Sequence, residues 1–310
     1  MIKVKNLFKQ YKEVTALNNF NLTVEDGEIY GLVGPNGSGK TTSINCILSL
    51  LNYEKGEVYL FGEKMSDSRT DLKAKIGYIP QEISVIYDLN VYDNIDFFCS
   101  LYISNKEKRR KYVEEAIDFV ELNEFRKFFP SKLSGGLKRR LNIACGIVHK
   151  PKLIIFDEPT VAVDPQSRNK ILEGIKDLNK KGATIIYTSH YMEEVEYLSS
   201  KISIIDKGHI LITGTTKELK NFVGLGNYLE INNIIMSSNL ENLLKSINGV
   251  NKLLKIDDNI KIVVDNDMTI SAIINYLNEN NIIYDSLNIK TPTLNDVFLD
   301  ITGRELRDNA

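Results

Sequence analysis

The sequence contains no run of apolar residues that approaches the roughly 18 needed to span a membrane. Its first residues, Met1 to Lys5, do not form the apolar core of a signal peptide. Cysteine is scarce, and Cys46, Cys99 and Cys145 lack the paired spacing of a metal site. We therefore expect a chain that is soluble by itself and intracellular, with reduced and buried thiols.

The chain also lacks an excess of either charge. Its 39 Lys and Arg residues are balanced by 41 Asp and Glu residues, which gives a net charge of −2. No global positive field would attract nucleic acid, so nucleic acid is not an expected partner. The chain has 310 residues. Single hydrophobic cores stop growing near roughly 250–300 residues, so two domains are expected.

One segment, Gly34 to Thr42, matches the phosphate-binding pattern G-x-x-x-x-G-K-[ST] completely. Its members are Gly34, Pro35, Asn36, Gly37, Ser38, Gly39, Lys40, Thr41 and Thr42. The apolar run Ile29–Val33 precedes the segment and suits a buried strand. The residues that follow it have the spacing of an amphipathic helix: Ile44, Ile47, Leu48 and Leu51. Strand, loop and helix in this order predict a site for a nucleoside triphosphate.

The residue types of this loop suit phosphate chemistry. Glycine lets backbone N–H groups approach phosphate oxygens, and the start of the following helix adds its positive end. Lys40 is expected to contact the β- and γ-phosphates, and the Thr41 hydroxyl is expected to bind Mg²⁺. Thr42 either contacts phosphate or only starts the helix, and the sequence leaves both options open.

A second apolar run, Lys152 to Phe156, ends in Asp157 and Glu158. A parallel strand buried on both faces has this form, and ligands gather beyond the carboxyl ends of such strands. Because successive side chains point in opposite directions, the two carboxylates are expected to have different roles. Asp157 suits the Mg²⁺ shell, usually through water, and Glu158 suits proton transfer from the attacking water. A pair of solvated acids is the alternative, which the P-loop makes the weaker one.

The next predicted strand, Ala183–Ser189, ends at His190. A lone histidine is more often structural than catalytic. Here it follows the strand after the acidic one, where a γ-phosphate would be within reach. His149 and His209 have no such placement, and we interpret both as structural or surface residues.

Between the P-loop and the acidic strand, Ser134, Gly135 and Gly136 open a predicted helix. The helix has an expected buried stripe of Leu141, Ala144, Cys145 and Val148. Its first N–H groups would form a second anion-binding helix end.

These motifs, taken in order, resemble the ATP-binding subunit of ABC transporters from Ile2 to Phe222. The matching segments are Walker A at Gly34–Thr42, Gln81 in the Q-loop, the signature at Ser134–Gly136, Walker B at Leu153–Glu158, the D-loop at Val163–Pro165 with Asp164, the switch histidine at His190, and Tyr11 as the aromatic that stacks on adenine.

The resemblance implies an α/β fold of the P-loop NTPase class, with a RecA-like core and a helical subdomain at about 83–145. It implies ATP and Mg²⁺ as cofactors, with Glu158 polarising water, His190 holding the γ-phosphate side, and Gln81 sensing Mg²⁺ and water. Ser134–Gly136 of one subunit would close on ATP held by the P-loop of another subunit. The P-loop would therefore be only half of an ATP site.

The expected partners are a separately encoded transmembrane permease and a second ATP-binding subunit, either an identical copy or a paralogue. By resemblance, the helical subdomain docks the permease near Ile83–Phe98, so the protein would be peripheral on the inner face of the cell membrane. Two departures occur. Leu137 follows the signature glycines where Gln is common, and Val161–Asp164 replaces the usual D-loop form.

After Gly224–Gly226, a predicted linker, the pattern changes to a small α+β domain. Its elements are expected at Tyr228–Ile231, Leu240–Ile247, Leu253–Ile256, Ile260–Val264, Ile270–Leu277 and Ile283–Ile289, with a turn at Asp257–Asn259. The order β-α-β-β-α-β is ferredoxin-like. The predicted domains are therefore 1–222, which binds ATP, and 227–310, which is accessory.

The closing segment Thr291–Arg304 resembles the tail of bacterial drug-, lipid- and polysaccharide-export ATPases, so export is the favoured function. The alternatives are a soluble ATPase of the same fold in translation or repair, an importer subunit, and a small-molecule P-loop kinase.

Overall fold

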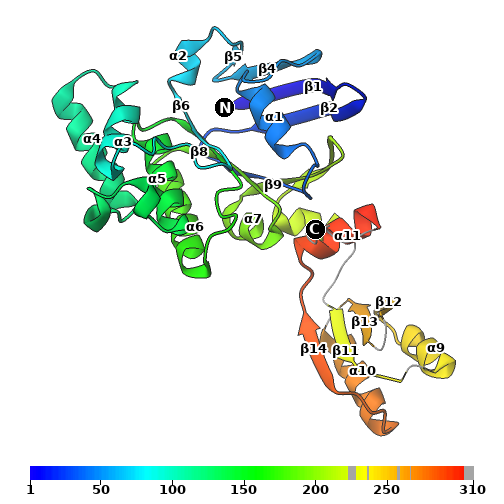
Figure 1. Cartoon of the computed structure of the whole chain (residues 1–310). Coiled ribbons are helices and arrows are strands. Elements are labelled where there is room, and N and C mark those ends of the chain that lie inside the picture. Colours follow the sequence, from blue (N-terminus) through cyan, green and yellow to red (C-terminus); the bar gives the residue numbers. More distant parts are fainter. Residues whose placement is uncertain (223–227, 236, 257–258, 266, 304–310) are drawn as a thin grey trace. The chain divides into compact units, whose positions relative to one another are not determined.

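The computed structural model describes residues 1–222, 228–235, 237–256, 259–265 and 267–303 (Figure 1). Packing divides the chain into two compact units, and the boundary along the sequence falls between Thr215 and Thr216. Helix α8 (Thr216–Phe222) belongs to the second unit because it packs against α11 (Leu294–Thr302). The sequence predicts a first domain of 1–222, so this segment differs from the division by packing. The linker at 224–226 lies outside the described residues.

The first unit is built on a six-stranded sheet with the order β10-β9-β3-β8-β7-β6. Neighbouring strands are parallel except for β10 and β9. The strands are β3 (Ile29–Val33), β6 (Ile76–Ile79), β7 (Leu153–Asp157), β8 (Thr184–Ser189), β9 (Lys201–Asp206) and β10 (His209–Gly214). Strands β3, β7 and β8 are buried along their whole length, as parallel strands covered on both faces must be. The strands predicted before the P-loop and before Glu158 are confirmed.

A second, antiparallel sheet has the order β2-β1-β4-β5. Its strands are β1 (Ile2–Tyr11), β2 (Val14–Val24), β4 (Lys55–Leu60) and β5 (Glu63–Lys64). Helix α1 (Lys40–Ile47) shares one apolar core with both sheets. Ile44, Ile47 and Leu48 are buried there as predicted, but the helix ends at Ile47, so Leu51 lies beyond it and is only partly buried.

The predicted helical subdomain contains α3 (Val91–Ser100), α4 (Lys106–Phe119) and α5 (Gly135–Ile147), which pack against one another (Figure 1). The predicted stripe of α5 is buried at Leu141, Ala144, Cys145 and Val148. Ile95 and Cys99 of α3 and Val113 and Ile117 of α4 are buried as well. Tyr102 lies beyond the end of α3, is 43% exposed and stacks on His149 with ring centroids 3.9 Å apart. The remaining α-helices of the unit are α2 (Thr70–Lys73), α6 (Pro165–Lys180) and α7 (Met192–Leu198), and two short 3-10 helices lie at Asn123–Phe125 and Pro130–Lys132.

The second unit contains the predicted β-α-β-β-α-β order. The elements are β11 (Tyr228–Asn232), α9 (Ser238–Ser246), β12 (Val250–Ile256), β13 (Asn259–Val264), α10 (Asp267–Glu279) and β14 (Ser286–Lys290). They form an antiparallel sheet with the order β12-β13-β11-β14. Residues 257 and 258 of the predicted turn lie outside the described residues.

Apolar side chains of α9 and α10 pack on the sheet of this unit, with Leu229, Ile262 and Ile273 fully buried. Helix α11 is joined to β12 and β13 by the ion pairs Lys252–Asp300 and Lys261–Asp296. The three cysteines are free and buried, as predicted. None of the helices in the described ranges is long and apolar enough to cross a bilayer.

Candidate nucleotide-binding site

The P-loop joins β3 to α1 and is shaped by its own backbone and lysine. Gly37 and Gly39 have φ angles of 75° and 109°, in the left-handed region that favours glycine. The Lys40 Nζ atom donates to the carbonyl oxygens of Gly34 (2.8 Å) and Pro35 (3.1 Å). Gly34, Pro35 and Ser38 are buried, whereas the tip at Asn36–Gly37 is exposed. Lys40 therefore ties together the buried part of the loop, and the tip of the loop is open to solvent.

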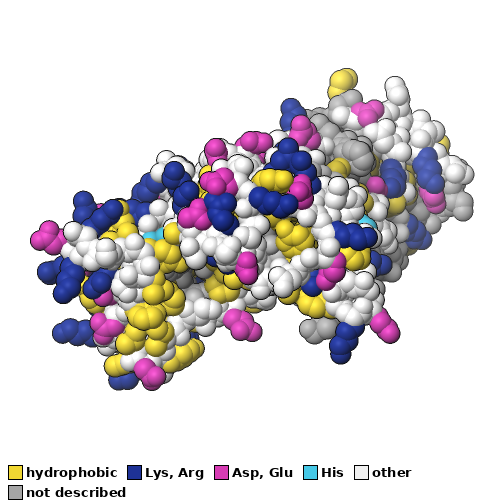
Figure 2. Space-filling model, turned by 90° about the horizontal axis from the view of Figure 1, so that it is seen from above, with side chains coloured by type: hydrophobic (Ala, Val, Ile, Leu, Met, Phe, Trp, Pro, Cys, Tyr) yellow, Lys and Arg dark blue, Asp and Glu magenta, His cyan; other side chains and the backbone are white. Residues whose placement is uncertain are grey.

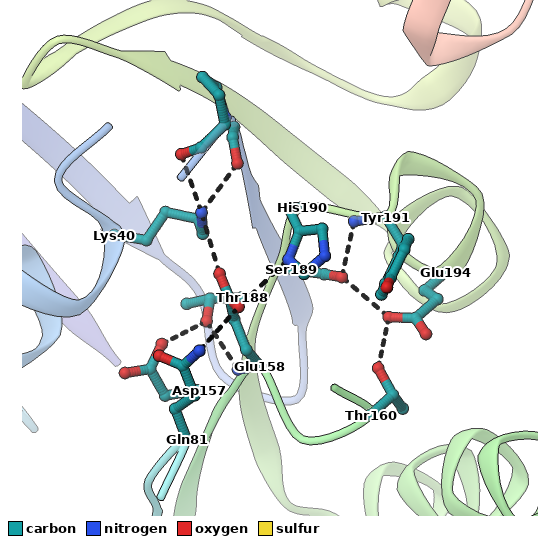
Figure 3. Close-up of polar contacts among 12 residues, drawn as sticks. Lys40, Gln81, Asp157, Glu158, Thr160, Thr188, Ser189, His190, Tyr191 and Glu194 are labelled. Atoms are coloured by element: carbon teal, nitrogen blue, oxygen red, sulfur yellow. Dashed lines mark hydrogen bonds and ion pairs between the residues drawn. The ribbon is translucent and has the colours of Figure 1, made fainter. Parts of the chain in front are cut away.

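The carboxylate of Glu158 is the centre of the site (Figure 3). Its Oε1 atom lies 3.0 Å from Lys40 Nζ, and its Oε2 atom lies 3.1 Å from His190 Nδ1. The Gln81 side chain donates to the same Oε2 atom at 3.3 Å. The structure thus brings Lys40, Gln81, Glu158 and His190, which are far apart in the sequence, to a single carboxylate.

Glu158 is only 4% exposed. Burial opposes its ionisation, but the hydrogen bond to His190 and the charge of Lys40 outweigh burial and lower its pKa below the ordinary value. The backbone of Glu158 has a φ angle of 48°, which turns the chain out of β7, and its N–H group lies 3.1 Å from the Thr188 hydroxyl oxygen. The site therefore holds an ionised carboxylate at the end of a buried strand.

Asp157 is fully buried beside Glu158. Thr188 donates to its Oδ1 atom at 2.6 Å, whereas its Oδ2 atom has no hydrogen-bond partner among the described residues. Burial raises the pKa of Asp157, and the hydrogen bond from Thr188, with a smaller contribution from the nearby Thr41 hydroxyl, partly offsets that effect. No group of three or more His, Cys, Asp or Glu side chains in the described part of the chain could hold a metal ion.

The signature and the D-loop form a second group. Ser134 caps α5 by accepting from the Leu137 N–H group (3.3 Å), and Asp164 caps α6 by accepting from the Ser167 N–H group (2.9 Å). A Cβ atom at Gly136 would lie 2.8 Å from Ser167 Oγ and 3.2 Å from an Asp164 carboxylate oxygen. The two motifs therefore lie side by side.

Gly135 faces more open space, because the nearest atom to a Cβ there would be the Ala162 carbonyl oxygen at 3.8 Å. Within the described ranges, no hydrogen bond or ion pair joins Ser134–Gly136 or Asp164 to the P-loop. The chain thus carries two separate groups of predicted site residues.

The remaining predicted residues lie at the edges of these groups. Tyr11 ends β1 with 46% of its surface exposed, and Lys9 Nζ lies 5.3 Å from its ring centroid. Thr41 is exposed and Thr42 half-buried, both in the first turn of α1. Leu137 is half-buried on α5.

The sequence interpretation missed two buried charged residues near the site. Arg139 on α5 is 6% exposed and donates to the Pro80 carbonyl oxygen at 3.1 Å, directly before Gln81. Glu194 on α7 is 2% exposed and accepts hydrogen bonds around His190. Arg139 stands in the basic run Lys138–Arg140 and Glu194 among other glutamates, so neither shows a sequence signal that separates it from a solvated residue.

Comparisons with known protein families cover most of the chain. The model described as "ABC transporter" matches residues 17–161. The model described as "ATP-binding protein DrrA1-3-like, C-terminal domain" matches residues 214–302. The two matches follow one another along the chain, as the two units do.

Two curated relatives match over nearly the whole length of the chain. The linearmycin resistance ATP-binding protein LnrL of Bacillus subtilis (strain 168) is 35% identical over 311 residues, which cover 99% of this chain and 100% of the relative. The daunorubicin resistance ATP-binding protein DrrA2 of Streptomyces coeruleorubidus is 28% identical and covers 97% of this chain and 95% of its own length.

Solved structures share the fold of the first unit. The dimeric post-hydrolysis state of an ATP-binding cassette bound to ADP and Pi is 31% identical, with a TM-score of 0.65. The match covers 69% of this chain and 98% of that structure. The α/β cassette fold with its P-loop, predicted from the sequence, is confirmed. The chain belongs to the ATP-hydrolysing, ATP-binding subunits of ABC transporters.

Proposed function

We propose that this chain energises export by a separately encoded transmembrane permease, as one of two ATP-binding subunits on the inner face of the cell membrane. One observation carries this proposal: the similarity to the linearmycin resistance protein extends over 100% of that protein, through both units. The match of the C-terminal unit to the DrrA1-3-like domain supports the same conclusion. The two alternatives, a soluble ATPase and an importer subunit, do not explain these full-length similarities to resistance proteins.

In this proposal Glu158 accepts a proton from the water that attacks the γ-phosphate. Its contact with His190 favours the ionised form, which a proton acceptor must have. His190 and Gln81 orient it through their contacts with Oε2. Lys40, which here pairs with Glu158 and two loop carbonyls, would turn to the phosphates when ATP enters the loop.

The residues present fit Mg²⁺ as a cofactor. Asp157 offers a buried carboxylate oxygen without a hydrogen-bond partner among the described residues, and Thr41 offers a hydroxyl oxygen. Such hard oxygen ligands are those that Mg²⁺ prefers, usually together with water and phosphate oxygens. When bound, the ion would neutralise charge that develops on the phosphates.

The second group of residues would act on the ATP of the other subunit. Ser134, Gly135 and Gly136 open the N-terminus of α5, where N–H groups and the helix dipole favour a phosphate. Asp164 lies beside Gly136 and would close the same interface. Tyr11, with nearly half its surface exposed, would stack on adenine.

A groove of about 260 Å³ suits the permease. Pro80 and Ser84 of the Q-loop, Phe98 of α3 and Tyr102 are among the residues that line it. Hydrophobic side chains gather at the end of the first unit that carries α3 and α5 (Figure 2). A permease helix seated there would touch the segment that carries Gln81, which would link transport to hydrolysis.

Co-expression with a candidate permease tests the proposal. We expect co-purification of the two proteins, ATP hydrolysis that the permease stimulates, and ATP-dependent export of drugs, lipids or peptides in inverted membrane vesicles. The Glu158→Gln variant should co-purify without driving export. Uptake instead of export would favour the importer alternative, and hydrolysis that is indifferent to any permease would favour the soluble ATPase.

A further inference from the structure

The buried carboxylate of Glu194 joins several segments around the site (Figure 3). Its Oε2 atom accepts hydrogen bonds from Thr160 Oγ1 (2.9 Å), Tyr187 OH (2.7 Å) and Ser189 Oγ (2.8 Å). Its Oε1 atom forms an ion pair with Arg168 of α6 at 2.5 Å. Oε2 is therefore hydrogen-bonded to side chains from β8 and the segment after β7, whereas Oε1 is paired with a charge on α6 without a hydrogen bond among the described residues.

One of these contacts fixes the backbone on both sides of His190. The Ser189 hydroxyl donates to Glu194 and also accepts from the Tyr191 N–H group at 2.9 Å. Ser189 and Tyr191 are the residues directly before and after His190. The carboxylate thus holds the short turn that presents the histidine ring to Glu158.

Another contact reaches the segment that carries Glu158. Thr160 follows Glu158 by two residues and donates to the same Oε2 atom of Glu194. Both partners of the 3.1 Å contact between Glu158 and His190 are therefore anchored to one carboxylate. Movement of either segment would strain the hydrogen bonds of the other.

A buried carboxylate is costly to keep unless it is paired and hydrogen-bonded, and an apolar side chain would fill the same space at lower cost. We propose that Glu194 is a positioning residue for ATP hydrolysis, which holds the His190 turn in register with Glu158. This inference rests on the proposed roles of Glu158 and His190.

The Glu194→Gln variant tests the inference, because it removes the charge that pairs with Arg168 and leaves one end of the side chain unable to accept from any of the present donors. We expect kcat for ATP hydrolysis to fall by at least about tenfold while KM for ATP changes by less than about twofold, as for a group that acts only on the transition state. Glu193→Gln is the matched control, because it removes the same charge from an exposed neighbour on α7. Equal kcat values for the two variants would overturn the inference.

A milder pair of variants separates positioning from stability. Ser189→Ala breaks the link between Glu194 and the His190 turn, whereas Tyr187→Phe removes another hydrogen bond to the same Oε2 atom and leaves that turn intact. We expect the larger loss of kcat in Ser189→Ala, at a comparable loss of Tm. Losses of kcat that simply follow Tm in both variants would mean a merely structural role.

The His190→Ala variant distinguishes a failure of the inference from a failure of the proposed function. If His190→Ala hydrolyses ATP normally, the proposed role of His190 is wrong. If His190→Ala is impaired, the double variant with Glu194→Gln should lose little more than His190→Ala alone, because the two residues act as one unit. Losses of kcat that multiply independently would overturn the positioning role of Glu194.

Discussion

The two units of the chain differ in whether they bury charged side chains. In the first unit Lys40, Glu158 and Glu194 are each no more than 4% exposed, and each is paired. In the described part of the second unit no charged side chain is buried. Its ion pairs, such as Lys252–Asp300, join side chains that are 50% and 38% exposed.

This difference indicates where the chemistry lies. Buried charge lowers stability unless it is well paired, and it gathers where a reaction requires it. The second unit is instead stabilised by an apolar core between its sheet and helices, with solvent-exposed pairs around it. An accessory role for the second unit fits this arrangement.

The largest effect should follow from neutralising the buried carboxylate. In Glu158→Gln we expect kcat for ATP hydrolysis to fall by about 10²- to 10⁴-fold, the usual contribution of general base catalysis. ATP should still bind, and a closed dimer should accumulate in size-exclusion chromatography with ATP. Near-normal turnover would remove Glu158 as the base.

The second largest effect should follow from removing the buried ammonium group of Lys40. Lys40→Ala should lower ATP affinity by about a hundredfold, since loss of one partner of a buried charge contact costs roughly 2–5 kcal/mol. Equilibrium binding of a fluorescent ATP analogue measures this effect. Undiminished affinity would contradict the role of Lys40 in phosphate binding.

A smaller effect is expected at the half-buried position after the signature glycines. Leu137→Gln restores the residue that is common in the family, but the Ser134 cap of α5 uses the backbone N–H group of residue 137, which both side chains share. We expect the ATPase rate to stay within about tenfold, or 1.4 kcal/mol in barrier height. A hundredfold rise would show that the leucine suppresses turnover.

The smallest effect should come from an exposed lysine of the second unit. Lys252→Ala breaks the pair with Asp300 and should lower the free energy of unfolding by at most about 1 kcal/mol, as for exposed ion pairs. Chemical denaturation and the ATPase rate together measure it, with Lys40→Ala as the contrasting lysine truncation. A large loss of ATPase activity would mean that the second unit takes part in the reaction cycle.

Much of this molecule could be predicted because its motifs are local. The P-loop glycines, the strand before Asp157 and the helix start at Ser134 each follow from a few adjacent residues and their periodicity. Short strand-like and helix-like apolar patterns, separated by turn residues, also predicted the order of elements in the second unit. These features depend on backbone conformation, which short segments largely determine.

The contacts that organise the site could not be predicted in this way. Glu194 lies in a helix that also carries Glu193 and Glu196, and only its distant partners Thr160 and Tyr187 distinguish it. Helix α8 joined the second unit because it packs on α11, whose residues follow it by more than seventy positions. The burial of Glu194 and the place of α8 are therefore both determined by tertiary packing.

The unequal surroundings of Gly135 and Gly136 have a consequence for genetics. An alanine at 136 would press on Ser167 and Asp164 of its own chain, so its phenotype would combine local damage with any effect on a neighbouring subunit. An alanine at 135 meets only ordinary van der Waals distances. In the proposed dimer, position 135 is therefore the better place for a dominant-negative allele, because a chain altered there would keep its own packing and impair the ATP site of a wild-type partner.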